Sequence, residues 1–327
     1  MKSGFRYKVL SVALGLVGVA SAAYGLDAAQ QTPAIPGVVA AGTPIEFIKE
    51  GFKGTEGPVG LNDGSLLFTE TQDKRITRIS ADGSVSTFLE NTNGSNGLGF
   101  APNGDLIAVQ VADTRVGVIH PPERARTLAE SYEGKRFGRP NDLVVDKRGT
   151  VYFTDSGASA AQLAQSNIDP ASVAKPAVYR ISPSGVLSRI AADIERPNGI
   201  QLSPDEKVLY VANTWGEHVL AYDIKPDGSL GPRRNFAKLA GFTKTETGYS
   251  SGADGLAVDA EGRLYVASTA GIQVFDKKGE ALGIISLPKS PQNIAFAGAD
   301  KKTLYAVGRG SAWWVATLTQ GYVGRAK

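Results

Sequence analysis

The sequence contains no cysteine among its 327 residues. This absence excludes disulfide bonds, cysteine-ligated zinc, c-type haem attachment and a thiol nucleophile. Small exported domains depend on such cross-links, whereas a chain of this length can bury a core large enough to be stable without them. The fold must therefore be held together by core packing.

Long runs of like charge are also absent, and only 20% of the residues are charged. Glycine and proline, by contrast, number 39 and 17. This composition is typical of a soluble, turn-rich globular protein and excludes a disordered chain.

The N-terminus has the layout of a secretory signal peptide, which we place at residues 1–22. Lys2, Arg6 and Lys8 precede the apolar run Val9–Val19, which ends in Ala20-Ser21-Ala22. The alternative, a membrane anchor, would need about 20 apolar residues. Cleavage would remove these three cations and no acid, which takes the formal net charge from +3 to 0.

Several expectations follow from that cleavage. The mature protein would begin with a leader over residues 23–43 and would be exported, periplasmic or secreted, with no stable membrane association. A chain without net positive charge offers no basic surface for nucleic acid. We therefore expect no nucleic-acid partner and look for a small-molecule substrate.

Six segments of the sequence share one pattern: an oxygen-bearing side chain, an apolar run, a turn and a second apolar strand. The six oxygen-bearing residues are Glu56, Asn96, Asn141, Asn198, Asp254 and Asn293. Most repeats add a third strand, and often a turn and a fourth strand. Short strands separated by Gly, Asp and Asn at this spacing predict antiparallel sheet throughout.

Repeats of about 40 to 55 residues with four strands each are the sequence form of a β-propeller. We predict an all-β fold, a six-bladed β-propeller of four-stranded antiparallel blades over residues 44–327. The last repeat ends on its third strand, SAWWVATLTQG, so the strand in TPIEFIKEG near the start is expected to complete it. Residues 157–175, rich in Ala and Ser, interrupt the third repeat as a solvated loop or as a lid over one face.

Equivalent positions in six blades lie at the same height and radius, so the six oxygen-bearing side chains should form a ring at the mouth of the central channel. Any one of these motifs alone would be read as a turn. Two carboxylates, Glu56 and Asp254, with several amide carbonyls suit one divalent cation, Ca²⁺ before Zn²⁺, Mn²⁺ or Mg²⁺. His120 and His218 lie late in their repeats, which argues against a Ser-His-Asp hydrolase.

Four separated signatures resemble one known family. The segments EGPVG, RPNDLVVDKRGTVYFTD, RPNGIQLSPDEKVLYVANT and ADGLAVDAEGRLYVAS are similar, in this order, to the gluconolactonase/senescence-marker-protein (regucalcin-like) family. The resemblance covers roughly residues 46–321. It implies a six-bladed propeller with one catalytic divalent cation in the channel mouth. The sequence departs from the family at Gly60, where an aromatic residue is common, and in the Ala-rich insertion.

The resemblance also implies roles for individual residues. Glu56, Asn198 and Asp254 would be metal ligands, Asn141 a further ligand or substrate contact, and Arg139 a substrate-binding cation. We add Asn96 of the ring as a substrate contact. For Arg139, a surface ion pair is the alternative. Trp215, Trp313 and Trp314 either wall a pocket or pack between blades.

Lactone hydrolysis is the function that these expectations favour. The cation would make a lactone carbonyl more electrophilic and a nearby water more acidic. Asp254, at the metal with a second oxygen free, is the predicted general base. The alternatives are a phosphotriesterase that uses the same metal, and a non-catalytic ligand-binding propeller, since fold alone does not decide function.

Overall fold

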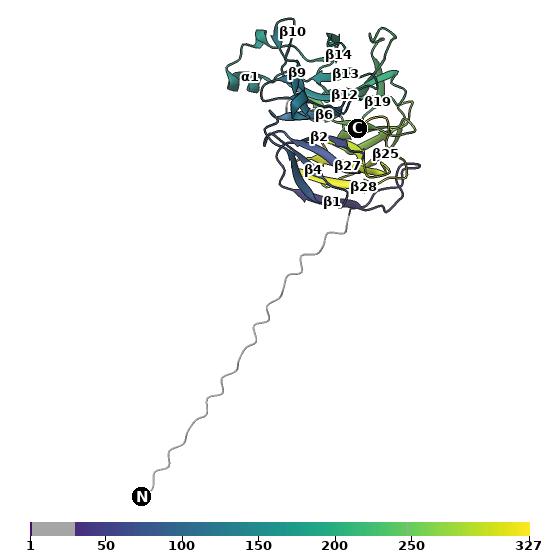
Figure 1. The fold of residues 1–327 in the computed structure, drawn as a ribbon. Helices are drawn as coiled ribbons and strands as arrows, with labels where there is room; N and C mark the ends of the chain where they lie inside the picture. The colour runs from purple at the N-terminus through teal and green to yellow at the C-terminus, as the bar shows by residue number, and fades with distance from the viewer. Residues whose placement is uncertain (2–29, 247) are drawn as a thin grey trace.

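Six four-stranded sheets are arranged around one axis (Figure 1), which confirms the predicted six-bladed β-propeller. The computed structural model describes Met1, residues 30–246 and residues 248–327. Apart from Met1, the predicted signal peptide lies outside the described residues, as do residues 23–29 of the predicted leader. In the described part of the chain, no helix is long and apolar enough to cross a membrane.

Each blade runs outward from the axis in four antiparallel strands. The inner strands are β2 (Thr55–Gly60), β6 (Ser95–Phe100), β12 (Pro140–Val145), β16 (Pro197–Leu202), β22 (Leu256–Val258) and β26 (Asn293–Ala297). The second strands are β3 (Leu66–Glu70), β7 (Leu106–Gln110), β13 (Val151–Asp155), β17 (Val208–Asn213), β23 (Leu264–Ser268) and β27 (Thr303–Gly308). Each inner strand contacts the inner strands of both neighbouring blades, so the ring around the channel is closed.

The two outer positions of most blades are more exposed, although the third strand of the fifth blade is fully buried. The third strands are β4 (Arg75–Ile79), β8 (Arg115–His120), β14 (Ala177–Ile181), β18 (His218–Asp223), β24 (Gly271–Phe275) and β28 (Ser311–Ala316). The outermost strands are β5 (Val85–Leu89), β9 (Arg126–Ala129), β15 (Leu187–Ala191), β19 (Arg234–Lys238), β25 (Ala281–Ile285) and β1 (Ile45–Glu50).

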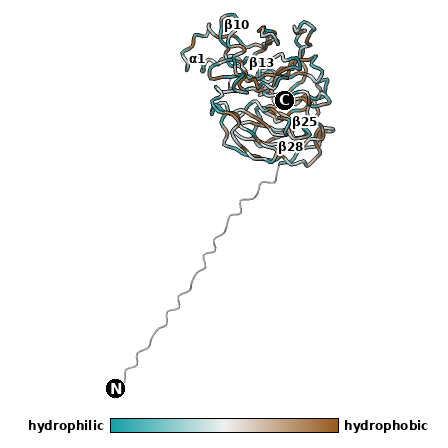
Figure 2. The backbone as a smooth tube through the Cα atoms, viewed as in Figure 1, coloured by the Kyte–Doolittle hydropathy of each residue, from teal (hydrophilic) through white to brown (hydrophobic). Residues whose placement is uncertain are grey.

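The hydrophobic core lies between neighbouring blades. Val109 and Val116 of the second blade, for example, pack in one buried cluster with Leu143 and Phe153 of the third. The second strands are buried on both faces, which is why LLFTE and VYFTD contain no clear alternation of polar and apolar residues. Figure 2 shows the hydrophobic segments in the strands and the hydrophilic ones mainly in the connections.

The strand predicted to complete the last blade does so. β1 pairs antiparallel with β28, with Ile45 opposite Val315 and Glu50 opposite Ser311. The first strand of the propeller is thereby hydrogen-bonded to the last one, and the ring closes without leaving β28 as an open edge.

The described part of the predicted leader packs onto the propeller. Ile35, Val38 and Val39 are buried in a cluster with residues of the last two blades. Gly283 leaves room for Ile35, since a Cβ there would lie 2.7 Å from Ile35 Cγ1. The Val38 carbonyl accepts a hydrogen bond of 2.8 Å from the Leu318 N–H.

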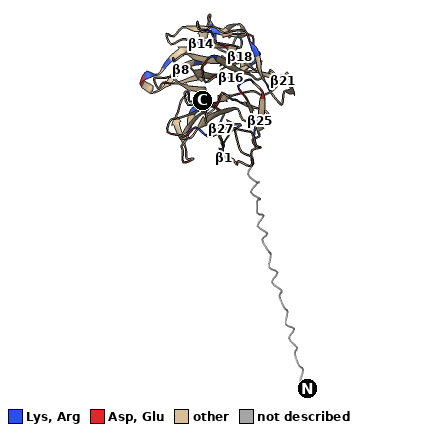
Figure 3. Cartoon of the chain, turned by 90° about the vertical axis from the view of Figure 1, so that its right-hand side faces the viewer, with Lys and Arg blue, Asp and Glu red and all other residues tan. Residues whose placement is uncertain are grey.

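The segment after β28, residues 317–327, crosses the end of the channel opposite the inner-strand starts. Its backbone bonds to three blades: Tyr322 N–H to the Val258 carbonyl (3.1 Å), Gly60 N–H to the Ala326 carbonyl (2.7 Å) and Gln201 Nε2 to the Lys327 carbonyl (3.2 Å). Figures 1 and 3, which differ by a 90° turn, both place the C-terminal end within the ring. We call residues 317–327 the tail.

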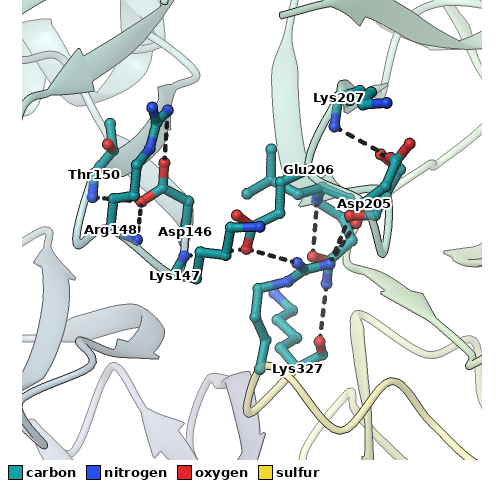
Figure 4. A network of polar contacts seen from close by, with 12 residues as sticks. Asp146, Lys147, Arg148, Thr150, Asp205, Glu206, Lys207 and Lys327 are labelled. Carbon is teal, nitrogen blue, oxygen red and sulfur yellow. Dashed lines mark hydrogen bonds and ion pairs between the residues drawn. The ribbon is translucent and has the colours of Figure 1, made fainter.

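Cationic side chains anchor the tail at this end of the channel, and Figure 4 shows Lys327 of the tail among the polar contacts there. Arg325 donates to the Leu202 carbonyl at 2.6 Å and pairs with Glu206 at 3.4 Å. Lys301 donates to carbonyl oxygens of the tail. A hollow of about 490 Å³ is lined by the tail and by the far ends of the inner strands, and none of the predicted site residues lines it.

The connections between the blade strands contain short helices and hairpins. They are the 3-10 turns η1 (Pro122–Arg124) and η2 (Pro170–Ser172), the helix α1 (Ala160–Ser166), and the hairpins β10 (Ser131–Tyr132) with β11 (Lys135–Arg136) and β20 (Thr243–Thr245) with β21 (Gly248–Ser250). Both hairpins, like α1, lie in connections that run between the mouth-side ends of strands.

Candidate metal centre

The inner strands present their ring residues through β-bulges. The register with the second strand shifts between Glu56 and Val59 in β2, and again after Ser95 in β6, Pro140 in β12 and Pro197 in β16. A bulge sets two residues opposite one and re-aims a side chain. In these strands the bulge is what directs the oxygen-bearing side chain toward the axis.

The glycine after the ring residue is required by the neighbouring blade. A Cβ at Gly57 would lie 1.9 Å from the Asn96 carbonyl oxygen, and one at Gly199 would lie 2.1 Å from the Asp254 carbonyl oxygen. These distances are far below van der Waals contact. The recurring Asn-Gly and Glu-Gly pairs therefore reflect close packing of adjacent inner strands as well as turn chemistry.

Threonines fix the ring residues of adjacent blades at one height. Thr69 Oγ1 donates to the Asn96 carbonyl at 2.9 Å, and Thr154 Oγ1 to the Asn198 carbonyl at 2.6 Å. Thr214 Oγ1 donates in the same way to the Ala253 carbonyl, next to Asp254, at 2.8 Å. Thr69 and Thr154 lie near the ends of the second strands β3 and β13, Thr214 directly follows β17, and each threonine holds the inner strand of the next blade.

The side-chain oxygens at the mouth lack protein partners. Among the described residues, Asn96 Oδ1, Asn141 Oδ1, Asn198 Oδ1 and Asp254 Oδ1 are buried and accept no hydrogen bond. A buried polar atom left unpaired costs about 1–3 kcal/mol. Four such oxygens around one channel are accounted for if a cation binds among them, so the residues present fit a divalent metal ion.

Two carboxylates belong to the same cluster. Burial, followed by the charge of Asp142, raises the pKa of Glu56 to about 7. Burial, then the charges of Glu56 and Asp142, raise the pKa of Asp254 well above its usual range. The two predicted carboxylate ligands therefore lie within electrostatic reach of each other, and a bound cation would relieve their repulsion.

Amide oxygens must complete any coordination sphere. Within residues 30–246 and 248–327, no three histidine, aspartate or glutamate side chains converge to form a metal site by themselves. Two carboxylates with amide carbonyls are a hard, all-oxygen donor set of the kind that calcium prefers.

Asn293 differs from the other ring residues. Its strand pairs with β27 without a bulge, Asn293 lying opposite Val307 and Ile294 opposite Ala306. Its Oδ1 accepts the N–H of Ile294 at 2.9 Å, and its Nδ2 donates to Glu56 Oε2 at 3.3 Å and to Asp142 Oδ2 at 3.4 Å. Asn293 therefore supports the carboxylates as a hydrogen-bond donor, and its oxygen is not free for an ion.

Sequence reasoning missed a buried ion pair below the mouth. Asp142, fully buried, is paired with the ammonium group of Lys327, which reaches up the channel from the tail. One signal for Asp142 was present in the sequence, because glycine follows the ring residue in four of the six repeats and aspartate replaces it here. Lys327 carried no such signal.

Arg139 lies at the mouth, close to the carboxylates. Its charge lowers the pKa of Glu56, although less than burial raises it. Its backbone N–H donates to Asp155 Oδ1 at 2.6 Å, while its Nε is buried without a hydrogen-bond partner in the described structure. The Arg139 guanidinium forms no ion pair with a carboxylate among the described residues, so the alternative of a surface ion pair is not supported.

The histidines and two of the tryptophans lie away from this cluster. His120 and His218 are on the third strands β8 and β18, as their place in the repeats predicted. Trp313 is buried in the core between blades, and Trp314 packs at its edge. Trp215 is 45% exposed beyond the mouth-side end of β17, where the Arg196 guanidinium lies 5.1 Å from its ring centre.

Comparison with known proteins identifies the family. Residues 54–308 match the family model described as the SMP-30/Gluconolactonase/LRE-like region. The chain belongs to this family.

Relatives of this SMP-30/gluconolactonase family member include a gluconolactonase of Zymomonas mobilis, 32% identical over 89% of this chain and 86% of the relative. A solved structure of a Xanthomonas campestris gluconolactonase is 27% identical with a TM-score of 0.73, covering 88% of this chain and 94% of that one. A calcium-binding regucalcin of Agrobacterium tumefaciens is 18% identical, with a TM-score of 0.68 over 85% of this chain and 95% of that one. That last likeness concerns the fold.

The departure of this family member at Gly60 has a packing cause. A Cβ at Gly60 would lie 2.3 Å from the Phe296 carbonyl oxygen of β26. The Gly60 N–H is also the donor that holds Ala326 of the tail. Gly60 therefore lets β2 approach β26 and the tail closely, and no larger side chain fits there.

The insertion of this family member, residues 157–175, begins at the mouth of the channel. Asp155 Oδ1 accepts both the Arg139 N–H and, at 2.9 Å, the N–H of Gly157, where the insertion begins. Ser159 caps α1 in a capping box with Gln162. A hollow of about 150 Å³ separates the helix from the propeller and is lined partly by Leu163 and Phe137. Residues 157–175 thus contain α1 and η2 and begin next to Arg139, and their role as a lid stays a prediction.

Proposed function

We propose that this protein is a metal-assisted lactonase that opens a cyclic ester, such as a sugar lactone, at the mouth of the propeller channel. The observation that supports this most is the set of four buried side-chain oxygens without partners among the described residues, one of them from Asp254, close to the Glu56 carboxylate. Membership of the gluconolactonase family and the Zymomonas relative point to the same reaction.

Glu56, Asn198 and Asp254, with Asn141, would hold the cation. Ca²⁺ is the ion that we favour, since all of these donors are hard oxygens and none is nitrogen or sulfur. When bound, the cation supplies Lewis-acid polarisation of the lactone carbonyl. Burial, and after it the repulsion among the carboxylates, raises the pKa values of Glu56 and Asp254, and the charge of the cation would offset that repulsion.

Asp254 is the proposed general base. Its carboxylate has two oxygens, so one can face the cation while the other accepts a proton from water. Asp254 takes a proton from water as the water oxygen bonds to the lactone carbonyl carbon. The ring C–O bond then breaks, and the proton passes to the departing ring oxygen, which gives the open hydroxy acid. Arg139, Asn141 and Asn96 would orient the substrate.

The test is a panel of lactones, assayed after chelation and after metal add-back. We expect hydrolysis to vanish with chelator, to return with Ca²⁺, and to fall by at least about 100-fold in Asp254→Asn. Asp223→Asn is the matched control, since that side chain is 65% exposed at the end of β18. Hydrolysis that is absent for every lactone, or indifferent to chelator, would remove the assignment. A phosphotriester in the same panel tests the alternative reaction on this metal.

Binding of the cation is measured separately from activity. Titration calorimetry of the chelated protein with Ca²⁺, Mg²⁺, Mn²⁺ and Zn²⁺ should rank Ca²⁺ first, and Glu56→Gln should weaken each ion because it removes one anionic donor. A higher affinity for Zn²⁺ than for Ca²⁺ would contradict the metal assignment.

Export is a separate part of the proposal. The basic, apolar and small-residue segments of residues 1–22 support cleavage after a secretory signal. N-terminal sequencing of the protein from the periplasm or medium should give a chain that begins near residue 23. A cytoplasmic protein that retains Lys2 would contradict it.

A further inference from the structure

Two arginines occupy equivalent places in adjacent blades. Arg139 precedes Pro140 of β12, and Arg196 precedes Pro197 of β16. The N–H of Arg139 is held by Asp155 Oδ1, and the N–H of Arg196 by Asn213 Oδ1 at 3.2 Å. Because β12 and β16 are in contact, the two side chains start from neighbouring points at the same height on the mouth.

These arginines have no direct carboxylate partner in the described part of the chain. Arg196 instead lies over the exposed ring of Trp215, which restricts its motion. Both arginines directly precede the prolines that begin β12 and β16, and these two inner strands are in contact. The structure thus keeps two like charges close together, although their repulsion is unfavourable.

A third cation faces the same mouth from the last blade. Arg309 lies in the turn between β27 and β28 with a left-handed φ of 52°, and Gln292 Oε1 holds its N–H at 2.8 Å. Nε2 of the same Gln292 donates to Glu56 Oε1 at 3.4 Å, which places the Arg309 backbone beside the metal centre. Arg309 is exposed and has no carboxylate partner in the described part of the chain.

A neutral lactone gives these cations little to bind. Its hydroxyl groups are weak acceptors, whereas a carboxylate or phosphate accepts paired N–H bonds from a guanidinium and neutralises its charge. With the carboxylates of Glu56 and Asp254 engaged by the cation, the arginines would leave the mouth strongly positive. A negatively charged group on the substrate would relieve the repulsion between Arg139 and Arg196.

We propose that Arg196, together with Arg139, forms an anion subsite beside the metal centre, and that the preferred substrate is a lactone carrying a carboxylate or phosphate substituent. This inference rests on the proposed lactonase function. Arg196 is then a specificity-determining residue, and Arg309 adds a long-range attraction for the same anionic group.

The experiment compares three lactones with the same ring, in which the terminal carbon carries a hydroxymethyl, a carboxylate or a phosphorylated hydroxymethyl group. In the parent protein, kcat/KM for at least one anionic lactone should exceed that for the neutral one by about 10-fold or more. Arg196→Gln should lower this ratio by about 10- to 100-fold, and Arg196→Lys should restore part of it. Arg234→Gln, which removes a guanidinium from the outermost strand of the same blade, should leave the ratio unchanged.

The outcomes separate the two proposals. If the neutral lactone is hydrolysed as well as both anionic ones, or if Arg196→Gln changes the ratio no more than Arg234→Gln does, the anion subsite is wrong while the lactonase function stands. If no lactone is hydrolysed, the proposed function fails, and calorimetry with the open-chain dicarboxylate and monocarboxylate then decides the subsite. Tighter binding of the dicarboxylate that is lost in Arg196→Gln supports it, and equal binding overturns it.

Discussion

Replacing Lys327 with methionine should destabilise the whole propeller, although the residue lies in the last position of the tail. The Lys327 side chain is 4% exposed and that of its partner Asp142 is fully buried. Methionine keeps most of the aliphatic side chain but leaves the Asp142 carboxylate with only the Asn293 amide and the Leu143 N–H. Removing one partner of a buried ion pair costs about 3–5 kcal/mol, because the remaining charge is uncompensated.

The control is a surface ion pair of the same residue type. Lys289 and Glu50 lie 2.8 Å apart, but their side chains are 44% and 62% exposed. Such pairs contribute about 0–1 kcal/mol, so Lys289→Met should have little effect. Free energies of unfolding from urea titrations of the chelated proteins give the comparison. The double variant Lys327→Met/Asp142→Asn should regain much of the loss, since it leaves no buried charge.

Calcium provides a second readout of the same variant. The charge of Lys327 lowers the pKa values of both Glu56 and Asp254, so its removal makes the site more negative. Ca²⁺ should therefore bind Lys327→Met more tightly than the parent, while the double variant stays close to the parent. If Lys327→Met lowers the free energy of unfolding no more than Lys289→Met does, and leaves the calcium affinity unchanged, the Lys327 ammonium group does not lie in the channel. The buried ion pair with Asp142 would then be refuted.

Two further predictions concern the candidate metal centre, and a third concerns the strand that closes the propeller. In the presence of chelator, burial and the charge of Asp142 raise the pKa of Glu56 from an ordinary 4.5 to about 7. Between these two pH values the folded protein keeps a proton on Glu56 that the unfolded chain releases. Unfolding free energy should then fall by about 3 kcal/mol as pH rises from 4.5 to 7, and a Glu56→Gln protein with the same slope would contradict this. Gly199→Ala, whose Cβ would lie 2.1 Å from the Asp254 carbonyl oxygen, should weaken calcium binding by at least about 10-fold in calorimetry, whereas Gly185→Ala, with open space around it, should not. Ile45→Asp in β1 should lower the urea midpoint by burying a charge beside Val315, and an unchanged midpoint would show that β1 does not close the ring.

Much of the candidate site could be predicted because it is built from a repeated local unit. Glu56, Asn141, Asn198 and Asp254 head four of the six repeats, and a rotation axis carries equivalent positions to equivalent places. The exception, Asn293, shows the limit of that reasoning. Asn293 also heads its repeat, but its strand β26 pairs with β27 without a bulge. Its side-chain amide therefore donates to Glu56 and Asp142.

The periodic pattern of strands and turns was sufficient to specify the six blades, their four strands and the strand Ile45–Glu50 that closes the ring, because each blade depends mainly on neighbours in the chain. The pairing of Asp142 with Lys327 spans 185 residues, and the approach of Arg139 to Arg196 joins two blades. Such contacts exist only once the ring is closed, since no local pattern encodes which side chains meet across a channel. The oxygen donors proposed for the ion could thus be predicted from the repeats. The charged side chains that surround them could not, because they come from distant segments that meet only in the closed propeller.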